Sequence, residues 1–241
     1  GLKQLGDFDA ALQACDRTLA LQPAHVPAWC NCGELLSRRG EPALALRAYE
    51  QALALAPTHL AALIGRATVL TAQARPRDAL VSAEQAVRLA PEDYEALRCL
   101  GTALWKLRRF VDAARYLEKA RRIEPGARSL LGALMYAYMS CCDWHAHKEL
   151  QVLVEAHLQQ GEWVAQPFVM IGCTGSAALL RRCAEMQMQA TAPTQAHLAL
   201  PAHPSGRLRV AYLSADFHTH ATAYLIAELF ELHDRSRLEV L

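Results

Sequence analysis

Net charge is nearly absent from this chain of 241 residues, because 25 Lys and Arg offset 24 Asp and Glu and leave +1 at pH 7. Such a balance gives no reason to expect nucleic acid or an anionic membrane as a partner. Long apolar runs are also missing: Leu130–Met139 has only ten residues, about half of what a transmembrane helix needs. No secretory signal is visible. The sequence predicts a soluble protein.

Cysteine pairs are missing as well, although the chain has eight Cys. No C-x-x-C pair occurs, and Cys30 and Cys32 are two residues apart on one predicted helix, so they lie on different faces. His145 and His147 have the same spacing and point apart for the same reason. The pattern favours buried, reduced thiols in a cytoplasmic protein and predicts no metal site.

What the chain has is a period of 34 residues, marked by Pro23, Pro57, Pro91 and Pro125. This period is typical of tandem helix-turn-helix repeats of the tetratricopeptide (TPR) type. A Pro at the exit of the second helix ends that helix, because it lacks a backbone N–H and clashes with the preceding turn. The period therefore predicts a mostly α fold, a TPR α-solenoid of stacked antiparallel helix pairs.

The repeat also places bulky and small residues at fixed positions, and small residues stand where two helices cross closely. Three consecutive repeats fit: Trp29, Gly33, Leu36, Ala45, Tyr49, Ala52; Leu63, Ala67, Leu70, Ala79, Ala83, Ala86; and Leu97, Gly101, Leu104, Ala113, Leu117, Ala120. The large residues that we expect to be buried between helices are Trp29, Tyr49, Leu63, Leu97 and Leu104.

Residues 1–125 are thus predicted to form about 3.5 repeats. Residues 1–25 read as a repeat cut through its first helix, with Ala11 and Pro23 in register. A TPR array buries each apolar face against a neighbour and usually ends in a polar cap. Because this N-terminus has neither a cap nor an initiator Met, we expect the chain to be an internal piece of a longer protein.

After Pro125 the repeat fades. Residues 126–190 are predicted to be a degenerate repeat and a helical transition, in which His147 replaces the expected Ala and a helix runs from a cap at Asp143 to Gly161. Trp144 is expected to pack the transition helices. Residues 191–206 contain three Pro and read as a linker.

Residues 207–241 have a different pattern. Leu208–Leu213 is a β-type run, Thr222–Leu232 a predicted amphipathic helix, and Leu238 starts a second strand. Strand, helix and strand in this order predict a βαβ unit, the opening of a parallel α/β sheet. Ligands of such sheets bind beyond the carboxyl ends of strands, where helix N-termini favour phosphate. His220 stands at this place, and Thr222 has two open roles, as the N-cap or as a phosphate contact.

The stretch Leu208–Phe217, followed by His220 and Leu225, resembles the start of the catalytic region of O-linked N-acetylglucosamine transferases. These enzymes and the related SPINDLY proteins form glycosyltransferase family 41. The segment Glu-Leu-Phe-Glu-Leu-His-Asp at residues 228–234 resembles the bacterial members. The order of a TPR array, a transition with Cys-Asp-Trp at residues 142–144, and a βαβ start is also similar to that family.

The resemblance implies an inverting transfer of a sugar from a nucleotide-sugar to Ser or Thr of proteins, without a metal or cofactor. The implied fold is two Rossmann-like lobes (GT-B type), of which residues 207–241 would be the truncated start. The expected donor is UDP-N-acetylglucosamine. Other relatives in the family transfer fucose instead of N-acetylglucosamine. By motif, His220 corresponds to a family histidine near the donor diphosphate and the acceptor. Asn31 matches a position of the asparagine ladder that binds peptides in animal members, while the next two repeats have Gly65 and Cys99 there.

Two functions therefore stay open. The first is a fragment of a protein O-glycosyltransferase whose TPR array binds protein substrates; alone it is expected to be inactive, because catalysis needs both lobes. The second is a non-catalytic TPR scaffold that binds partner peptides in its concave groove.

Overall fold

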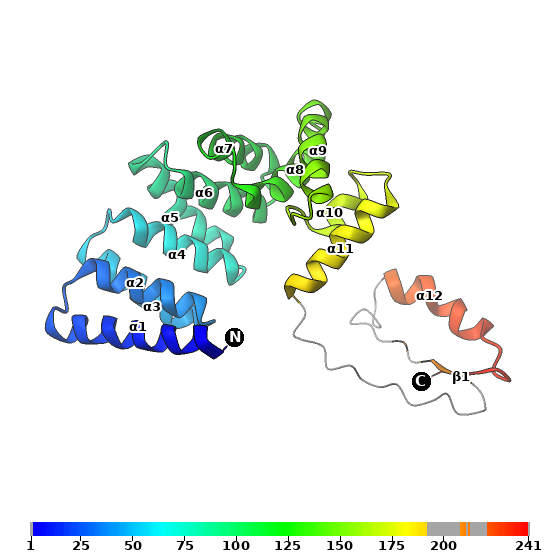
Figure 1. Cartoon of the computed structure of the whole chain (residues 1–241), viewed down its shortest axis with the longest axis horizontal. Helices are drawn as coiled ribbons and strands as arrows, with labels where there is room; N and C mark the ends of the chain where they lie inside the picture. Colours follow the sequence, from blue (N-terminus) through cyan, green and yellow to red (C-terminus); the bar gives the residue numbers. More distant parts are fainter. Residues whose placement is uncertain (1, 192–207, 211, 213–220, 241) are drawn as a thin grey trace. The chain divides into compact units, whose positions relative to one another are not determined.

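The computed structural model of the chain describes residues 2–191, 208–210, 212 and 221–240. It forms two compact units, residues 1–192 and 193–241, and each is described by itself. In the first unit, the regular secondary structure of residues 2–191 consists of helices, joined by turns and short irregular segments (Figure 1). None of the helices in the described ranges is both long and apolar enough to cross a bilayer.

The first unit consists of consecutive antiparallel helices. After α1 (Leu2–Leu21), three pairs follow: α2 (Val26–Arg38) with α3 (Pro42–Leu55), α4 (Leu60–Ala72) with α5 (Pro76–Leu89), and α6 (Tyr94–Lys106) with α7 (Phe110–Ile123). A short 3₁₀ turn (Arg128–Leu130) then leads into α8 (Leu131–Ser140), α9 (Trp144–Gln159), α10 (Pro167–Ile171) and α11 (Ala177–Thr191). This is a TPR-type α-solenoid.

The first helix of each pair begins at a capping side chain that recurs with the repeat. His25, His59 and Asp93 each accept a hydrogen bond from the backbone N–H three residues on, at 3.1, 3.4 and 2.8 Å. These bonds satisfy a donor that the first helical turn leaves unpaired. The second helices α3 and α5 instead begin at a Pro, whose fixed φ suits the first helical position.

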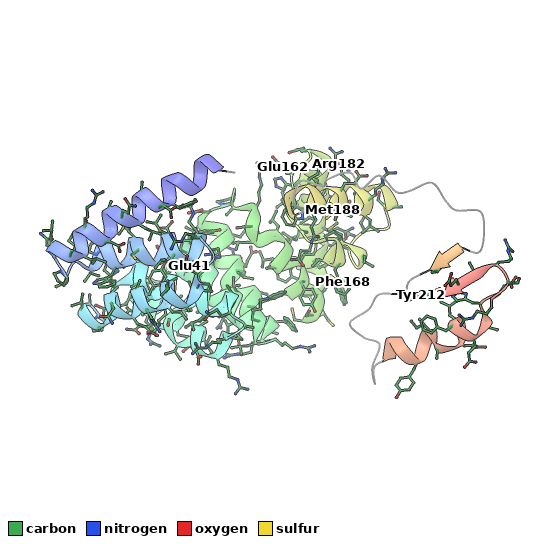
Figure 2. The ribbon with its side chains drawn as sticks, turned by 90° about the horizontal axis from the view of Figure 1, so that it is seen from below. Glu41, Glu162, Phe168, Arg182, Met188 and Tyr212 are labelled. Carbon is green, nitrogen blue, oxygen red and sulfur yellow. The ribbon has the colours of Figure 1, made fainter. Side chains whose placement is uncertain are left out.

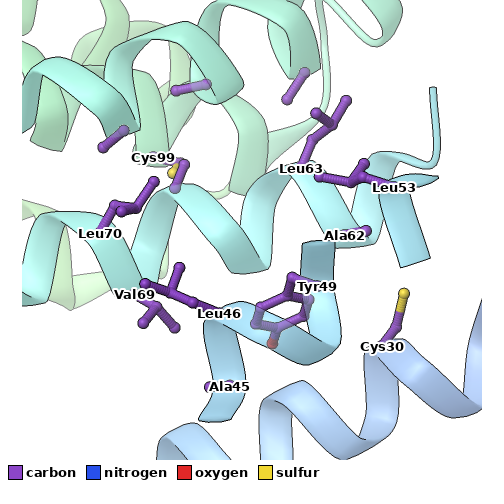
Figure 3. Close-up of a cluster of buried hydrophobic side chains, with 14 of the residues drawn as sticks. Cys30, Ala45, Leu46, Tyr49, Leu53, Ala62, Leu63, Val69, Leu70 and Cys99 are labelled. Carbon is purple, nitrogen blue, oxygen red and sulfur yellow. The ribbon is translucent and has the colours of Figure 1, made fainter. Parts of the chain in front are cut away.

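Small and large residues alternate at the crossings as the repeat predicts. Ala45, Ala79 and Ala113 are fully buried. The Tyr49 ring lies between Gly33 of α2 and Gly65 of α4, where a Cβ would overlap it; Figure 3 shows Tyr49 within this core. The predicted burial is confirmed for Tyr49, Leu63, Leu97 and Leu104, all at most 5% exposed. Trp29 is only partly buried, because its indole N–H turns outward to the carbonyl of Pro23, 2.8 Å away.

The N-terminal segment differs from the prediction. α1 is one continuous helix, whereas the repeat register places a turn between two helices near Gly6.

The fourth pair, α8 and α9, keeps the register with a changed residue. His147 occupies the place of Ala45, Ala79 and Ala113 and is 7% exposed. Its Nε2 is buried without a hydrogen-bond partner in the described structure. Asp143 caps α9 as expected, and Gly161, at φ +81°, follows its end. Trp144 is 58% exposed and contacts the His147 ring edge-on, so the expectation that it packs the transition helices is wrong.

The second unit contains β1 (Leu208–Val210), α12 (Ala221–Leu232) and β2 (Leu238–Val240). The two strands pair in parallel, with Leu208 opposite Leu238. They are the whole sheet within the described residues. α12 begins one residue earlier than predicted, so Thr222 lies in its first turn and not at the N-cap position.

Candidate peptide-binding groove

The first helices of three successive pairs line one groove of about 660 Å³. Its walls come from the same positions of the repeat: Ala61 and Ile64 of α4, and 34 residues later Glu95 and Arg98 of α6. α2 adds Glu34, Ser37 and Arg38. A regular repeat thus places equivalent side chains in rows along one face.

The floor of the groove depends on glycine. Gly65 has no side chain, and the Tyr49 ring occupies the space that a Cβ would need. Burial raises the pKa of Tyr49 to about 12, so its phenol is neutral at physiological pH. The floor is therefore uncharged, and charged side chains of α2 and α6 lie beside it.

The walls carry paired charges of both signs. Arg98 donates to Glu95 from Nε and from a terminal nitrogen, at 2.9 and 2.6 Å. Burial alone would lower the pKa of Arg98, but the hydrogen bonds and charge of Glu95 raise it. At the other end of the groove, a terminal nitrogen of Arg38 lies 3.9 Å from a carboxylate oxygen of Glu34, one turn earlier on α2. Such a surface offers donors and acceptors to a polypeptide without favouring one net charge.

The predicted substrate contact Asn31 is exposed on α2 and is not among the residues that line this groove. Its two counterparts in the repeat cannot extend a ladder: Gly65 has no side chain, and Cys99 is buried, 3.8 Å from the Thr68 hydroxyl.

A second cavity, of about 480 Å³, lies among the end of α6, the start of α8 and the segment before α10. Ser129, Gly132 and Ala133 of its lining follow Glu95, Arg98 and Cys99 by 34 residues. The cavity therefore occupies the same repeat positions one pair further on. Trp105, Trp163 and Val169 supply its apolar walls.

Residues 162–166, which we call the strap, run along the start of α8, where Val164 and Ala165 lie against Gly132. The Gly132 N–H donates to the Val164 carbonyl at 3.1 Å. Glu162 pairs with Arg128 at 2.6 Å and with His157 at 2.5 Å, and Figure 2 labels Glu162 at the start of the strap. The strap thus covers the start of α8, in the fourth pair, with a segment of the same chain. The repeat register of Ser129 and Gly132 was the available signal in the sequence, but nothing local marked the strap.

The predicted catalytic residue His220 lies outside the described residues, as do residues 213–219. Thr222 is placed by its backbone only. Nearby, the Tyr212 hydroxyl and His233 Nε2 are 2.6 Å apart, which ties the end of β1 to the end of α12. Within the described ranges, no group of three His, Cys, Asp or Glu could hold a metal ion.

Two family models, both described as tetratricopeptide repeat, match residues 26–59 and 64–128. No curated protein matches the chain. Among solved structures, a double mutant of MamA RS-1 is 18% identical with a TM-score of 0.54, covering 79% of this chain and 90% of that one. TTC0263, a thermophilic TPR protein of Thermus thermophilus, is 19% identical with a TM-score of 0.54, covering 78% of this chain and 94% of that one.

YrrB, described as a TPR protein with an unusual peptide-binding site, is 18% identical with a TM-score of 0.52, covering 76% of this chain and 87% of that one. At these identities the likeness concerns the fold alone. Together with the matched repeats and the helix order, it shows that the helical part of this chain has the fold of a TPR α-solenoid.

Proposed function

We propose that this chain is a TPR scaffold that binds an extended segment of a partner protein in the groove lined by α2, α4 and α6. The observation that carries the proposal is the groove itself, which three first helices line and in which α4 and α6 present equivalent repeat positions, Ala61 with Glu95 and Ile64 with Arg98. The floor accepts apolar groups, and the paired charges on the walls offer hydrogen bonds to a peptide backbone. Similarity to TPR proteins, one of them with a peptide-binding site, supports this choice.

The test is a displayed library of random twelve-residue peptides, selected on the full chain and then measured one by one by fluorescence anisotropy. Ala61 is exposed in the groove, so Ala61→Trp should block it without disturbing the core. Val81, 60% exposed on α5, is not among the residues that line the groove, so Val81→Trp is the matched control. We expect Ala61→Trp to weaken binding about tenfold or more, the effect of losing well-packed contacts. Equal affinities for the two variants would refute the proposal.

A second candidate is that residues 207–241 open the Rossmann-like catalytic region of a protein O-glycosyltransferase. The parallel pairing of β1 and β2 on either side of α12 favours it, because parallel strands joined by a helix are the unit of such sheets. In the sequence His220 directly precedes α12, whose N-terminus carries partial positive charge. In this proposal the groove binds the acceptor protein, and His220 acts on the donor diphosphate or the acceptor hydroxyl.

Transfer of labelled sugar from UDP-N-acetylglucosamine to a protein acceptor tests this candidate in a longer protein that contains the chain. His220→Ala should lower kcat about 10²-fold or more, the usual effect of losing an acid, a base or a charge-stabilising donor. His218→Ala is the neighbouring control and should change kcat much less. Near-normal turnover in the His220 variant, with circular dichroism unchanged, would rule out this role.

A further inference from the structure

We infer that the cavity beside the strap binds a bulky apolar side chain of the partner segment, and that Lys106 pairs with an acidic residue next to that side chain. The inference rests on the proposed function, since the same extended segment would continue from the groove. It adds the chemistry of the partner: an apolar anchor flanked by negative charge.

The cavity is shaped for a large apolar group. Two indole rings, Trp105 and Trp163, and the side chain of Val169 form its walls, while Gly132 and Ala133 keep its base open. At Gly132 the strap comes so close that a Cβ would lie 3.1 Å from the Val164 carbonyl oxygen. Trp163 is 41% exposed, so an entering side chain would remove apolar surface from water on both partners.

A positive charge beside the cavity favours an acidic residue next to the anchoring side chain of the partner. The Lys106 ammonium lies over the Trp105 ring, 5.0 Å from its centre. In the described part of the chain, no carboxylate pairs with Lys106. Lys106 therefore brings an unpaired positive charge next to Trp105, which lines the cavity. A negative residue beside the anchor would complement this charge.

The strap limits how far a bound segment can continue along the first helices. The Val164 carbonyl of the strap accepts a hydrogen bond from the Gly132 N–H, so the strap already covers the start of α8. A partner segment following the groove from α4 to α6 would therefore reach the cavity that Trp105 and the strap line together. A cavity at this point suits an anchoring side chain.

Nuclear magnetic resonance of the ¹⁵N-labelled full chain tests the inference with three blocked peptides. The probe is acetyl-Gly-Asp-Phe-Asp-Gly-amide; one control replaces both Asp by Asn, and the other replaces Phe by Ala. The four Trp give four indole N–H signals, assigned by Trp105→Phe and Trp163→Phe. We expect saturable shifts of the Trp105 and Trp163 signals, with a dissociation constant of roughly millimolar for so small a ligand. The Asn control should bind about three- to tenfold more weakly, and the Ala control should leave both signals in place.

Variants separate the two parts of the inference. Ala133→Phe, with Ala133→Leu as the milder form, fills the cavity and should abolish the shifts. Lys106→Met should reduce the affinity for the Asp probe to that for the Asn control, while Lys119→Met, a cation on α7, should not. Equal shifts with all three peptides, or no effect of Lys106→Met, would overturn the inference.

The outcome is distinguishable from that of the proposed function. If library peptides bind and lose affinity in Ala61→Trp, but the probe moves neither Trp signal, the inference fails and the groove function stands. If no library peptide depends on Ala61 and the probe still moves both signals, the groove function fails and the cavity stands.

Discussion

The hydroxyl of Tyr138 donates a hydrogen bond of 3.2 Å to the carboxylate of Glu118 and joins helix α8 to helix α7. Arg121 donates two further hydrogen bonds to the same carboxylate, at 2.9 and 2.7 Å. Burial would raise the pKa of Glu118, but the bonds and charge of Arg121, the Tyr138 hydroxyl and the charge of Arg122 hold it below its ordinary value. This network fastens the fourth, divergent helix pair to the regular repeats.

Tyr138→Phe should destabilise the chain by about 1 kcal/mol, the usual net worth of one hydrogen bond, somewhat more when the acceptor is charged. Urea unfolding followed by circular dichroism measures the change. Tyr136→Phe is the control, because the Tyr136 hydroxyl makes no hydrogen bond within the described residues. Equal losses in the two variants would show that the bond to Glu118 adds nothing.

Glu118 should make stability sensitive to acid. Its folded-state pKa is lowered, so its contribution is fully present above the unfolded carboxylate value, about 4.3, and is lost as pH falls through the lower folded value. Free energies of unfolding between pH 7 and pH 3 should fall less steeply in Glu118→Gln than in the natural chain. Parallel curves would contradict the predicted linkage.

His147 should give a second pH dependence, at a higher pH. Burial lowers the pKa of His147, so the imidazole binds a proton less readily in the folded chain than in the unfolded chain. Stability from this source is full above about pH 6.5, the unfolded value, and declines as the pH drops below it. His147→Leu, of similar volume, should flatten the stability profile between pH 7 and pH 5. His145→Gln, at an exposed position of the same helix, is the control.

The recurrent caps predict a stabilising change. Asp93 caps α6 with a carboxylate, whereas His25 caps α2 with a neutral ring nitrogen. His25→Asp should stabilise by about 0.5–1 kcal/mol, because a carboxylate accepts the same bond and also interacts favourably with the helix N-terminus. Asp93→His should lower the free energy of unfolding by a similar amount. Thermal unfolding of both variants checks the pair, and a gain in Asp93→His would contradict the argument.

Gly65 predicts a steric penalty that a second change should relieve. A Cβ at this position would overlap the Tyr49 ring, so Gly65→Ala should cost about 1–3 kcal/mol through overpacking. Adding Tyr49→Leu should remove most of that cost, because the ring no longer occupies the space. Gly126→Ala, where nothing lies within 4 Å of the added carbon, is the control. A double-mutant cycle with no coupling between positions 49 and 65 would refute the steric account.

The sequence predicted the regular part of the fold well, because a repeat reports the same contact several times. Ala45, Ala79 and Ala113 stand in one register, and each fills the same crossing between helices. Trp144 was misjudged, since it occurs once and its hydrophobic character alone says nothing about which face of α9 is covered. The strap was missed for a related reason: its place depends on backbone contacts with α8 that have no residue pattern.

The candidate site was predicted unevenly. The groove follows from the periodic first helices, but Asn31, chosen by resemblance, does not line it. His220 and the rest of its loop lie outside the described residues, so the catalytic hypothesis stays a prediction. The parallel pairing of Leu208–Val210 with Leu238–Val240 was foreseeable from the strand-helix-strand order, because two parallel strands need a crossover between them.

The arrangement of helices in the first unit has a consequence for synthesis on the ribosome. Each helix from α2 to α8 packs mainly on the helices just before and after it in the chain. Each new helix can therefore pack on the helix made just before it, without waiting for distant sequence. The fourth pair is an exception, because one of its hydrogen bonds needs a residue made much later. The Gly132 N–H can donate to the Val164 carbonyl only after Val164 has emerged from the ribosome. Some thirty further residues must therefore be made before this hydrogen bond can form and the strap can cover the start of α8.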